Sequence, residues 1–331
     1  MIETYGYARA GFLGNPSDGY FGKTLSFAMS NFRARVLLYP SGRLELRPSK
    51  VDLPVFENLD DLYRITRWRG YYGGIRIIQA LIVRLVDYCR EQGIELPERN
   101  FTLEYESNVP QRLGLGGSSA IITASLRALC QYYTLDIPLP VQANLALETE
   151  TRELNVPAGL QDRVVQAYRG LVYMDFSRSL MQARGFGEYE RMDVGLLPKL
   201  YVAYQTSLSE GTEVFHNNLR ERWLRGDAEV VGAMETWAGY AAEGRQCLLE
   251  KNYDRLHELV NANFDLRAKI YRIDAGNLEM VHTARSVGAT SNFAGSGGAI
   301  VGTYDDEAMF GKLTEAMKLV GVAVIKPKIV T

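Results

Sequence analysis

Cysteine and histidine are scarce in this sequence, and their scarcity excludes several kinds of site. The chain of 331 residues contains three of each. The cysteines are Cys89, Cys130 and Cys247, and the histidines are His216, His257 and His282. Because the cysteines are far apart, odd in number and without a Cys-x-x-Cys pair, we expect buried reduced thiols rather than disulfides or a thiolate metal site. The histidines are isolated and form no His-Glu-x-x-His pattern, so we expect none of them to bind a metal ion.

An excess of positive charge is also missing. Lysine and arginine number 37 against 39 aspartates and glutamates, which leaves a formal net charge of -2. No basic field therefore attracts a nucleic-acid backbone or an anionic membrane, and we expect neither as a partner. The beginning of the chain lacks the basic and apolar regions of a secretory signal, and the most apolar helical stretch, residues 75–89, is shorter than the ~20 residues of a bilayer crossing. We therefore expect a cytoplasmic protein.

The composition is that of an ordinary globular protein, with 47% hydrophobic and 23% charged residues. These values exclude a disordered or collagen-like chain, and the length fits roughly two domains. Both halves mix helical and strand-like patterns, which predicts an α+β fold. We expect one domain over residues 1–180 and a second over residues 181–331. The stretch 177–198 lacks a regular pattern and is the expected hinge between them.

Hydrophobic periodicity predicts the order of the elements. Expected strands cover residues 5–13, 24–39, 44–47, 101–106, 171–176, 200–206 and 322–329, with a further strand pair on either side of residues 294–298. Expected helices cover residues 73–92, 120–133, 141–154, 161–168, 212–225, 228–250, 253–272, 277–287 and 306–320.

A glycine-rich loop at residues 113–119 separates an expected strand from an expected helix. It includes Gly114, Gly116 and Gly117, followed by Ser118 and Ser119. Glycines in this position let backbone N–H groups approach a phosphate at the positive end of a helix. The alternative is a tight turn in which one of the serines caps the helix. The loop does not match the dinucleotide-binding fingerprint, and no P-loop sequence is complete elsewhere in the chain.

A second glycine-rich loop occurs in the other half of the chain. It consists of Gly295, Ser296, Gly297 and Gly298, between apolar strand residues. A β-hairpin turn explains this loop without any ligand. Two glycine loops, one in each half, nevertheless favour a polyphosphate bound in a cleft between two domains.

Two carboxylates are candidates for chemistry. Asp162 follows the helix-breaking sequence Pro-Ala-Gly, where it would also serve as an ordinary acid in the first turn of a helix. Glu150 lies on the preceding expected helix, where the alternative is a solvated helical face. Together the two could supply a base and a ligand for Mg²⁺, because this ion takes oxygen ligands and needs only one or two protein carboxylates beside phosphates.

Three segments, in order, resemble the signature motifs of the GHMP small-molecule kinases. The motifs read RAGFLGNPSD at residues 9–18, a proline-led glycine loop GLGGSSA at residues 114–120, and FAGSGG at residues 293–298. Within this family, residues 13–24 and 158–176 resemble the sugar-1-kinase branch, most closely the glucuronokinases. The resemblance implies a two-domain fold, with an N-terminal mixed α/β domain and a C-terminal ferredoxin-like α+β domain.

The resemblance also implies roles for particular residues. Asp162 resembles the catalytic aspartate, Arg9 the basic residue near the reacting groups, and Asp18 the acid that holds sugar hydroxyls. Ser118, or Ser119 one residue later, resembles a Mg²⁺-binding serine, and Glu150 resembles the carboxylate ligand of the same ion. The second motif would bind the phosphates of ATP, while Asn292 stands where some members have lysine in the third motif.

The implied activity is an ATP- and Mg²⁺-dependent phosphorylation of a sugar or sugar acid at its anomeric hydroxyl. Two alternatives remain open: a related kinase for a neutral hexose or a heptose phosphate, and a sensor that binds nucleotide and sugar without turnover. A sugar acid would require an arginine or lysine for its carboxylate. The candidates for that role are Lys23, Arg67, Arg69 and Arg112.

Overall fold

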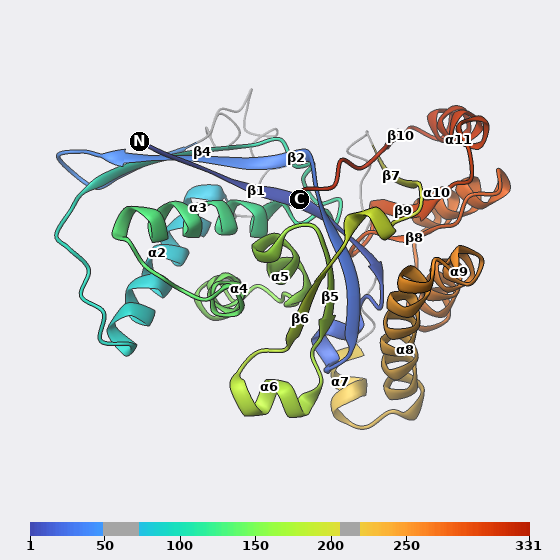
Figure 1. Ribbon diagram of the computed structural model, residues 1–331, viewed down its shortest axis with the longest axis horizontal. Helices are drawn as coiled ribbons and strands as arrows, with labels where there is room; N and C mark the ends of the chain where they lie inside the picture. The colour runs from blue at the N-terminus through green and yellow to red at the C-terminus, as the bar shows by residue number, and fades with distance from the viewer. Residues whose placement is uncertain (49–72, 206–218) are drawn as a thin grey trace, which may run out of the picture. The chain divides into compact units, whose positions relative to one another are not determined.

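The structure is a computed structural model that describes residues 1–48, 73–205 and 219–331 (Figure 1). The chain forms two compact units. The first contains residues 1–7, 32–109 and 117–158, and the second contains residues 8–31, 110–116 and 159–331. These two units interleave along the chain, and neither begins or ends near residue 180. The expected domain boundary between residues 180 and 181 therefore stays a prediction. Within the described ranges, no helix has both the length and the apolar character that crossing a membrane requires.

The first unit is built on an antiparallel pair of long strands. The C-terminal half of β2 (Lys23–Pro40) pairs with β4 (Phe101–Ser107), and the short β3 (Glu45–Arg47) runs parallel to β4. The strand β1 (Ile2–Leu13) pairs with β2. Burial alternates over its first half, which is typical of a strand that covers a core with one face, and residues 8–13 are all buried.

In the described part of the first unit, three helices accompany these strands, and Figure 1 shows them grouped together. They are α2 (Gly74–Glu91), α3 (Gly117–Tyr133) and α4 (Leu139–Glu148). The helix α3 is buried along most of its length, and small residues allow this close packing. A side chain on Gly6 could not be accommodated, because its Cβ would lie 1.9 Å from the carbonyl oxygen of Ala120. The strand that carries the first motif therefore packs directly on the helix that follows the second.

The expected helix over residues 141–154 is wrong in its last part. The helix α4 ends at Glu148, and residues Thr149–Glu153 form a π-helical turn (η3). Insertions of this kind are rare and often occur at functional sites. The turn also makes Glu150 a buried residue, 2% exposed, so the alternative of a solvated helical face is wrong for this side chain.

The second unit contains a four-stranded antiparallel sheet in the order β10-β7-β9-β8. Its strands are β7 (Leu200–Gln205), β8 (Asn292–Phe293), β9 (Ala299–Thr303) and β10 (Val322–Ile325). Numbered along the chain, these strands have the spatial order 4-1-3-2, with helices after the first and third. This is the β-α-β-β-α-β pattern of a ferredoxin-like fold, which confirms the expectation for this part of the chain.

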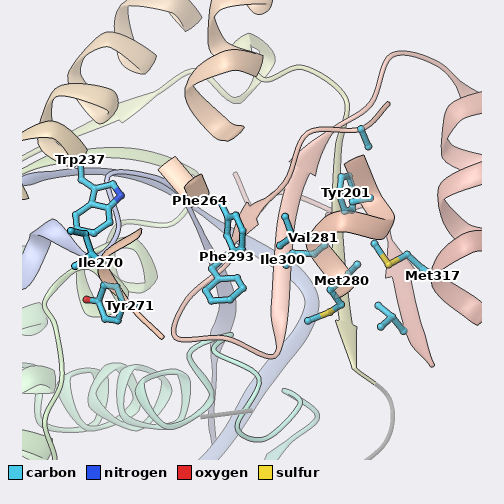
Figure 2. Close-up of a cluster of buried hydrophobic side chains, with 14 of the residues drawn as sticks. Tyr201, Trp237, Phe264, Ile270, Tyr271, Met280, Val281, Phe293, Ile300 and Met317 are labelled. Atoms are coloured by element: carbon cyan, nitrogen blue, oxygen red, sulfur yellow. The ribbon is translucent and has the colours of Figure 1, made fainter. Parts of the chain in front are cut away.

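Helices of the second unit pack beside this sheet. They are α7 (Leu219–Leu224), α8 (Ala228–Glu250), α9 (Tyr253–Ile270), α10 (Ala275–Ser286) and α11 (Glu307–Leu319). Figure 2 shows the aromatic part of their core, where Phe264 of α9 meets Phe293 edge to face with 5.2 Å between ring centroids. The indole of Trp237 is fully buried and donates a hydrogen bond of 3.0 Å to the Asn263 carbonyl. This core holds α9 firmly against β8.

The stretch 177–198, expected to be irregular, is ordered secondary structure. It contains the helix α6 (Arg178–Arg184) and the strand β6 (Glu188–Met192), which pairs antiparallel with β5 (Leu171–Asp175). The N-terminal half of β2 pairs with the other edge of β5. The expectation failed because β6 is half exposed and rich in charged residues, so its pairing on β5, not its own periodicity, makes it a strand.

Candidate active site

Arg9 lies on β1, and its guanidinium connects three segments of the second unit. Nε and Nη2 donate to the two carboxylate oxygens of Asp162, at 2.5 and 2.7 Å. Nη1 donates to the carbonyl of Ala294 at 2.7 Å and also to the carbonyl of Gly114. Because the arginine is only 5% exposed, these charge-assisted hydrogen bonds lie away from bulk water and are correspondingly strong. One side chain of the first motif therefore fixes Asp162 and both glycine loops.

Asp162 occupies the first turn of α5 (Gln161–Tyr168), where the helix dipole favours a negative charge. A second guanidinium stands beside it: Nη1 of the buried Arg163 lies 3.4 Å from Asp162 Oδ2 and donates to the Gly159 carbonyl at 2.9 Å. The Asp162 side chain nevertheless remains 20% exposed. The carboxylate is thus held in one orientation and still has surface available to a ligand hydroxyl.

The two glycine loops pack backbone against backbone in the second unit. A Cβ on Gly295 would lie 2.2 Å from the carbonyl oxygen of Gly114, so no other residue fits there without displacing that loop. Gly114 itself has a φ of +61°, which favours glycine. The strands β8 and β9 pair antiparallel on either side of residues 294–298, so this loop forms the expected hairpin turn. The contact with Gly114 is a further role of the same turn.

Asp18 lies in a short 3-10 helix, η1 (Ser17–Tyr20), and its carboxylate reaches the beginning of α5. Its Oδ2 accepts a hydrogen bond of 3.2 Å from the backbone N–H of Gln161. It also lies against Gly159, where an added Cβ would come within 2.2 Å of Oδ2. Burial raises the pKa of the Asp18 carboxyl to about 6, and the negative charge of Asp162 acts in the same direction. The two acids are therefore electrostatic neighbours at one end of α5.

A buried network of asparagines holds the first motif in place, and the sequence analysis did not identify it. On α9, Oδ1 of Asn263 accepts from the N–H of Gly14 at 2.8 Å, and Nδ2 donates to the Asn15 carbonyl and to Oδ1 of Asn292, both at 3.2 Å. Asn292 in turn donates to the Phe12 carbonyl at 3.0 Å. An asparagine on the buried face of an amphipathic helix was the available signal, because such a group needs partners.

Ser118 and Glu150 meet in the first unit. The hydroxyl of Ser118, in the first turn of α3, donates a hydrogen bond of 2.7 Å to Oε1 of Glu150. Two oxygen groups of the kind that Mg²⁺ prefers are therefore adjacent. Ser119, the alternative ligand, is 1% exposed. In the described part of the chain, no group of three or more His, Cys, Asp or Glu residues could hold a metal ion by itself.

The structure describes two of the four positive residues that are candidates for binding a substrate carboxylate. Lys23 forms an ion pair of 2.9 Å with Asp175, so its charge is already compensated. Arg112 has a φ of +60° in the turn before the second motif. Arg67 and Arg69 lie outside the described residues, as does His216. The three cysteines are free and buried, as expected.

Comparison with known proteins identifies the family. The sequence profile "GHMP kinases N terminal domain" matches residues 80–170. "Probable glucuronokinase 2" from Arabidopsis thaliana is 46% identical over 309 residues, which cover 91% of this chain and 84% of that protein. "Glucuronokinase 1" from the same organism is 45% identical over 306 residues, with the same coverage. The chain belongs to the GHMP kinase family.

Solved structures agree with this assignment at the level of the fold. The crystal structure of Lactococcus lactis galactokinase complexed with galactose superimposes with a TM-score of 0.76, at 15% sequence identity, over 99% of this chain and 93% of that one. This likeness confirms the expected two-domain GHMP kinase fold. The protein is accordingly a small-molecule kinase, an enzyme that transfers a phosphoryl group to a hydroxyl.

The kinase brings together most of the residues that its sequence indicated, in two groups. In the second unit, Arg9, Asp18 and Asp162 surround the beginning of α5, and Gly114 and Gly295 form the loop contact beside them. In the first unit, Ser118 and Glu150 form a hydrogen-bonded pair. The remaining glycines serve the loops themselves. Gly116 accepts a hydrogen bond of 2.9 Å from Gln166, Gly117 begins α3, and Ser296, Gly297 and Gly298 complete the turn between β8 and β9.

Proposed function

We propose that this kinase is a glucuronokinase, which converts D-glucuronate and ATP to D-glucuronate 1-phosphate and ADP. The structural observation that carries a kinase mechanism is the placement of Asp162, whose two oxygens accept from Arg9 while part of its surface stays accessible. Support for the sugar acid comes from the two Arabidopsis relatives, whose names state that activity and whose identity to this chain is about 45% over nine tenths of its length.

Asp162 would orient the anomeric hydroxyl toward the terminal phosphate. Phosphoryl transfer asks little covalent chemistry of a protein, because most of the catalysis is positioning and charge stabilisation. A carboxylate held bidentately by Arg9 is a well-fixed hydrogen-bond acceptor. An anomeric hydroxyl is more acidic than other sugar hydroxyls, so an orienting acceptor is sufficient. Arg9 would also stabilise negative charge that develops during transfer.

The second motif would bind the phosphates of ATP. Residues 113–116 lead directly into α3, and the first turn of that helix, which includes Ser118 and Ser119, presents N–H groups that have no partner within the helix. Gly114 and Gly116 have positive φ values, which let the backbone turn tightly before the helix begins. The carbonyl of Gly114 is occupied by Arg9, which holds the loop in this conformation.

Mg²⁺ is the expected companion of the nucleotide, and the residues present fit it. Ser118 and Glu150 would hold the ion, because they are adjacent oxygen donors and Glu150 is buried with its carboxylate against the hydroxyl. One carboxylate and one hydroxyl match the small protein contribution that Mg²⁺ takes when phosphates supply further oxygens. When bound, the ion would neutralise phosphate charge. This geometry favours Ser118 over Ser119 as the ligand.

Asp18 would accept hydrogen bonds from hydroxyl groups of the sugar. Its position beside Gly159 and the N-terminus of α5 places it near Asp162, the acceptor for the reacting hydroxyl. A carboxylate is suited to this role because each oxygen accepts more than one hydrogen bond. We place the reaction in the cytoplasm, since three buried, free thiols fit a reducing compartment.

An ADP-release screen tests the proposal. The purified protein is incubated with ATP, Mg²⁺ and each of D-glucuronate, D-galacturonate, galactose, fucose and heptose phosphates, and phosphorus NMR locates the phosphate on the product. We expect ADP release with glucuronate and a 1-phosphate product.

Two other results would replace this proposal. Preferential turnover of a neutral hexose or a heptose phosphate would identify a different sugar kinase. A ligand-dependent rise in melting temperature without any ADP release would identify a sensor.

A further inference from the structure

Arg267 is a buried cation that has no carboxylate partner in the described part of the chain. It lies near the end of α9 and is 2% exposed. Nη1 donates a hydrogen bond of 3.0 Å to the carbonyl of Gly295, in the third motif. Nε has no hydrogen-bond partner, and neither an acceptor for Nη2 nor an ion pair is found for this side chain among residues 1–48, 73–205 and 219–331. The edge formed by Nε and Nη2 is therefore buried without an acceptor among these residues.

The same edge of Arg9 shows what it is suited to bind. In Arg9, Nε and Nη2 hold the two oxygens of a carboxylate, while Nη1 donates to backbone carbonyls of the glycine loops. Arg267 Nη1 likewise donates to a backbone carbonyl of a glycine loop. Among the described residues, however, no carboxylate accepts from Nε and Nη2 of Arg267. Because a buried guanidinium stays charged and is costly to leave uncompensated, an anion is the ligand that this edge requires.

Packing holds the Arg267 guanidinium in position. Its central carbon lies 5.1 Å from the ring centroids of both Tyr271 and Phe293, which Figure 2 shows in the core beside α9. Contacts with aromatic faces stabilise a cation without supplying a hydrogen-bond acceptor. The side chain is thus preorganised, and a ligand would not have to order it.

Arg267 belongs to the neighbourhood of Asp18. The Gly295 carbonyl that accepts from Arg267 also accepts from Nδ2 of Asn15, three residues before Asp18, at 3.3 Å. Burial lowers the pKa of the Arg267 guanidinium, and the negative charge of Asp18 acts in the opposite direction, so the two groups lie within electrostatic range. Arg267 therefore shares a backbone acceptor with the segment that carries the acid that we assign to the sugar.

We propose that Arg267 binds the carboxylate of the sugar acid through its Nε–Nη2 edge and so selects sugar acids over neutral sugars. This inference rests on the proposed glucuronokinase activity and identifies the residue that would recognise the substrate's charge. A planar guanidinium pairs bidentately with a carboxylate, which adds orientation to attraction. Lys23, by contrast, already has Asp175 as its partner.

A pair of matched substrates tests this assignment. D-Glucuronate and D-glucuronamide have nearly the same shape, but only the first carries a charge. For Arg267→Gln we expect the KM for glucuronate to rise roughly 100-fold, the value for loss of a strong charge-assisted pair, with less than about a 3-fold change in the KM for glucuronamide and for ATP. Arg267→Lys keeps the charge without the fork and is expected to lie between the two. Arg255→Gln, on the exposed side of α9, is the control and should match the wild type.

The results distinguish a failure of the proposed glucuronokinase activity from a failure of the assignment of Arg267. A wild-type protein that does not phosphorylate glucuronate overturns the function and, with it, this assignment. A wild-type enzyme that does so, with Arg267→Gln and Arg267→Lys keeping its preference for glucuronate over glucuronamide, overturns the assignment alone. A rise in the KM for ATP, without one for glucuronate, would make Arg267 a phosphate ligand and also overturn it. Melting temperatures establish that each variant is folded, and Arg267→Lys preserves the test if the glutamine variant is not.

Discussion

The surroundings of Arg9 and Arg267 are two buried regions of the second unit that treat a positive charge differently. Arg9 is compensated from within the protein, by Asp162 and two loop carbonyls. Arg267 has one carbonyl and two aromatic rings, and its other edge lacks an acceptor in the described structure. The contrast indicates that the first arginine positions the protein's own groups. The second is left for an anion that the protein does not supply.

The largest expected effect concerns Asp162, the carboxylate partner of Arg9. Asp162→Asn should fold normally and lose about 10³-fold in kcat, because an amide in place of the carboxylate cannot accept both bonds of Arg9 and also orient the substrate hydroxyl. Steady-state kinetics and circular dichroism measure the two properties. Asp265→Asn, which removes an exposed partner of Arg285, is the control. Near-wild-type kcat in Asp162→Asn would remove this residue from the mechanism.

A stability measurement sharpens the contrast between the two arginines. Arg9→Met should lower the free energy of unfolding by about 3 kcal/mol, since it leaves the carboxylate of Asp162 and two loop carbonyls without their donor. Arg267→Met should change it by less than about 1 kcal/mol, because it removes a buried charge for which the described residues supply no carboxylate partner. Urea denaturation of both variants gives the comparison. Equal losses would show that Arg267 is compensated as fully as Arg9.

The pH dependence of the enzyme tests the role of Asp18, whose charge interacts with both Asp162 and Arg267. The pKa of Asp18 is raised to about 6, so kcat/KM for the sugar should fall below pH 6 if the ionised carboxylate accepts the sugar hydroxyls. The folded state holds this proton more tightly than the unfolded state, whose pKa is near 3.8. Its stabilising contribution is therefore complete below pH 4 and is lost as the pH rises through 6.

Asp18→Asn should accordingly lose the acidic limb of the rate profile and reduce kcat/KM at pH 8 by roughly 100-fold. Its melting temperature, relative to that of the wild type, should increase between pH 4 and pH 8. A variant that retains the acidic limb would assign this titration to another group.

The smallest expected effect concerns the support of Asp18. Gly159→Ala places a methyl group where the Asp18 carboxylate now lies, so this side chain must move away. We expect the KM for the sugar to rise about 10-fold with little change in kcat. Gly239→Ala, at an open position of α8, is the matched control and should leave the kinetics unchanged. Unaltered sugar binding in Gly159→Ala would show that Asp18 does not contact the substrate.

Hydrophobic periodicity predicted most of the helices and strands, because their buried residues recur with the period of a helix or a strand. The strands around residues 5–13 and 24–39 and the helices α2, α8 and α9 lie close to their expected positions. The failures have a common cause. The strand β6 is defined by pairing on β5, and the π-helical turn after α4 by local hydrogen bonds, neither of which leaves a hydrophobic period.

The order of the three motifs in the sequence was enough to predict the family and the kinase chemistry, because each motif is a local pattern that is rich in glycine. The tertiary structure alone decided which distant groups meet. Arg267 lies in an ordinary-looking helix, and only packing shows that it is buried against the third motif with one edge lacking a partner. Compensation of a buried charge depends on groups far apart in the chain, so no local pattern reports it.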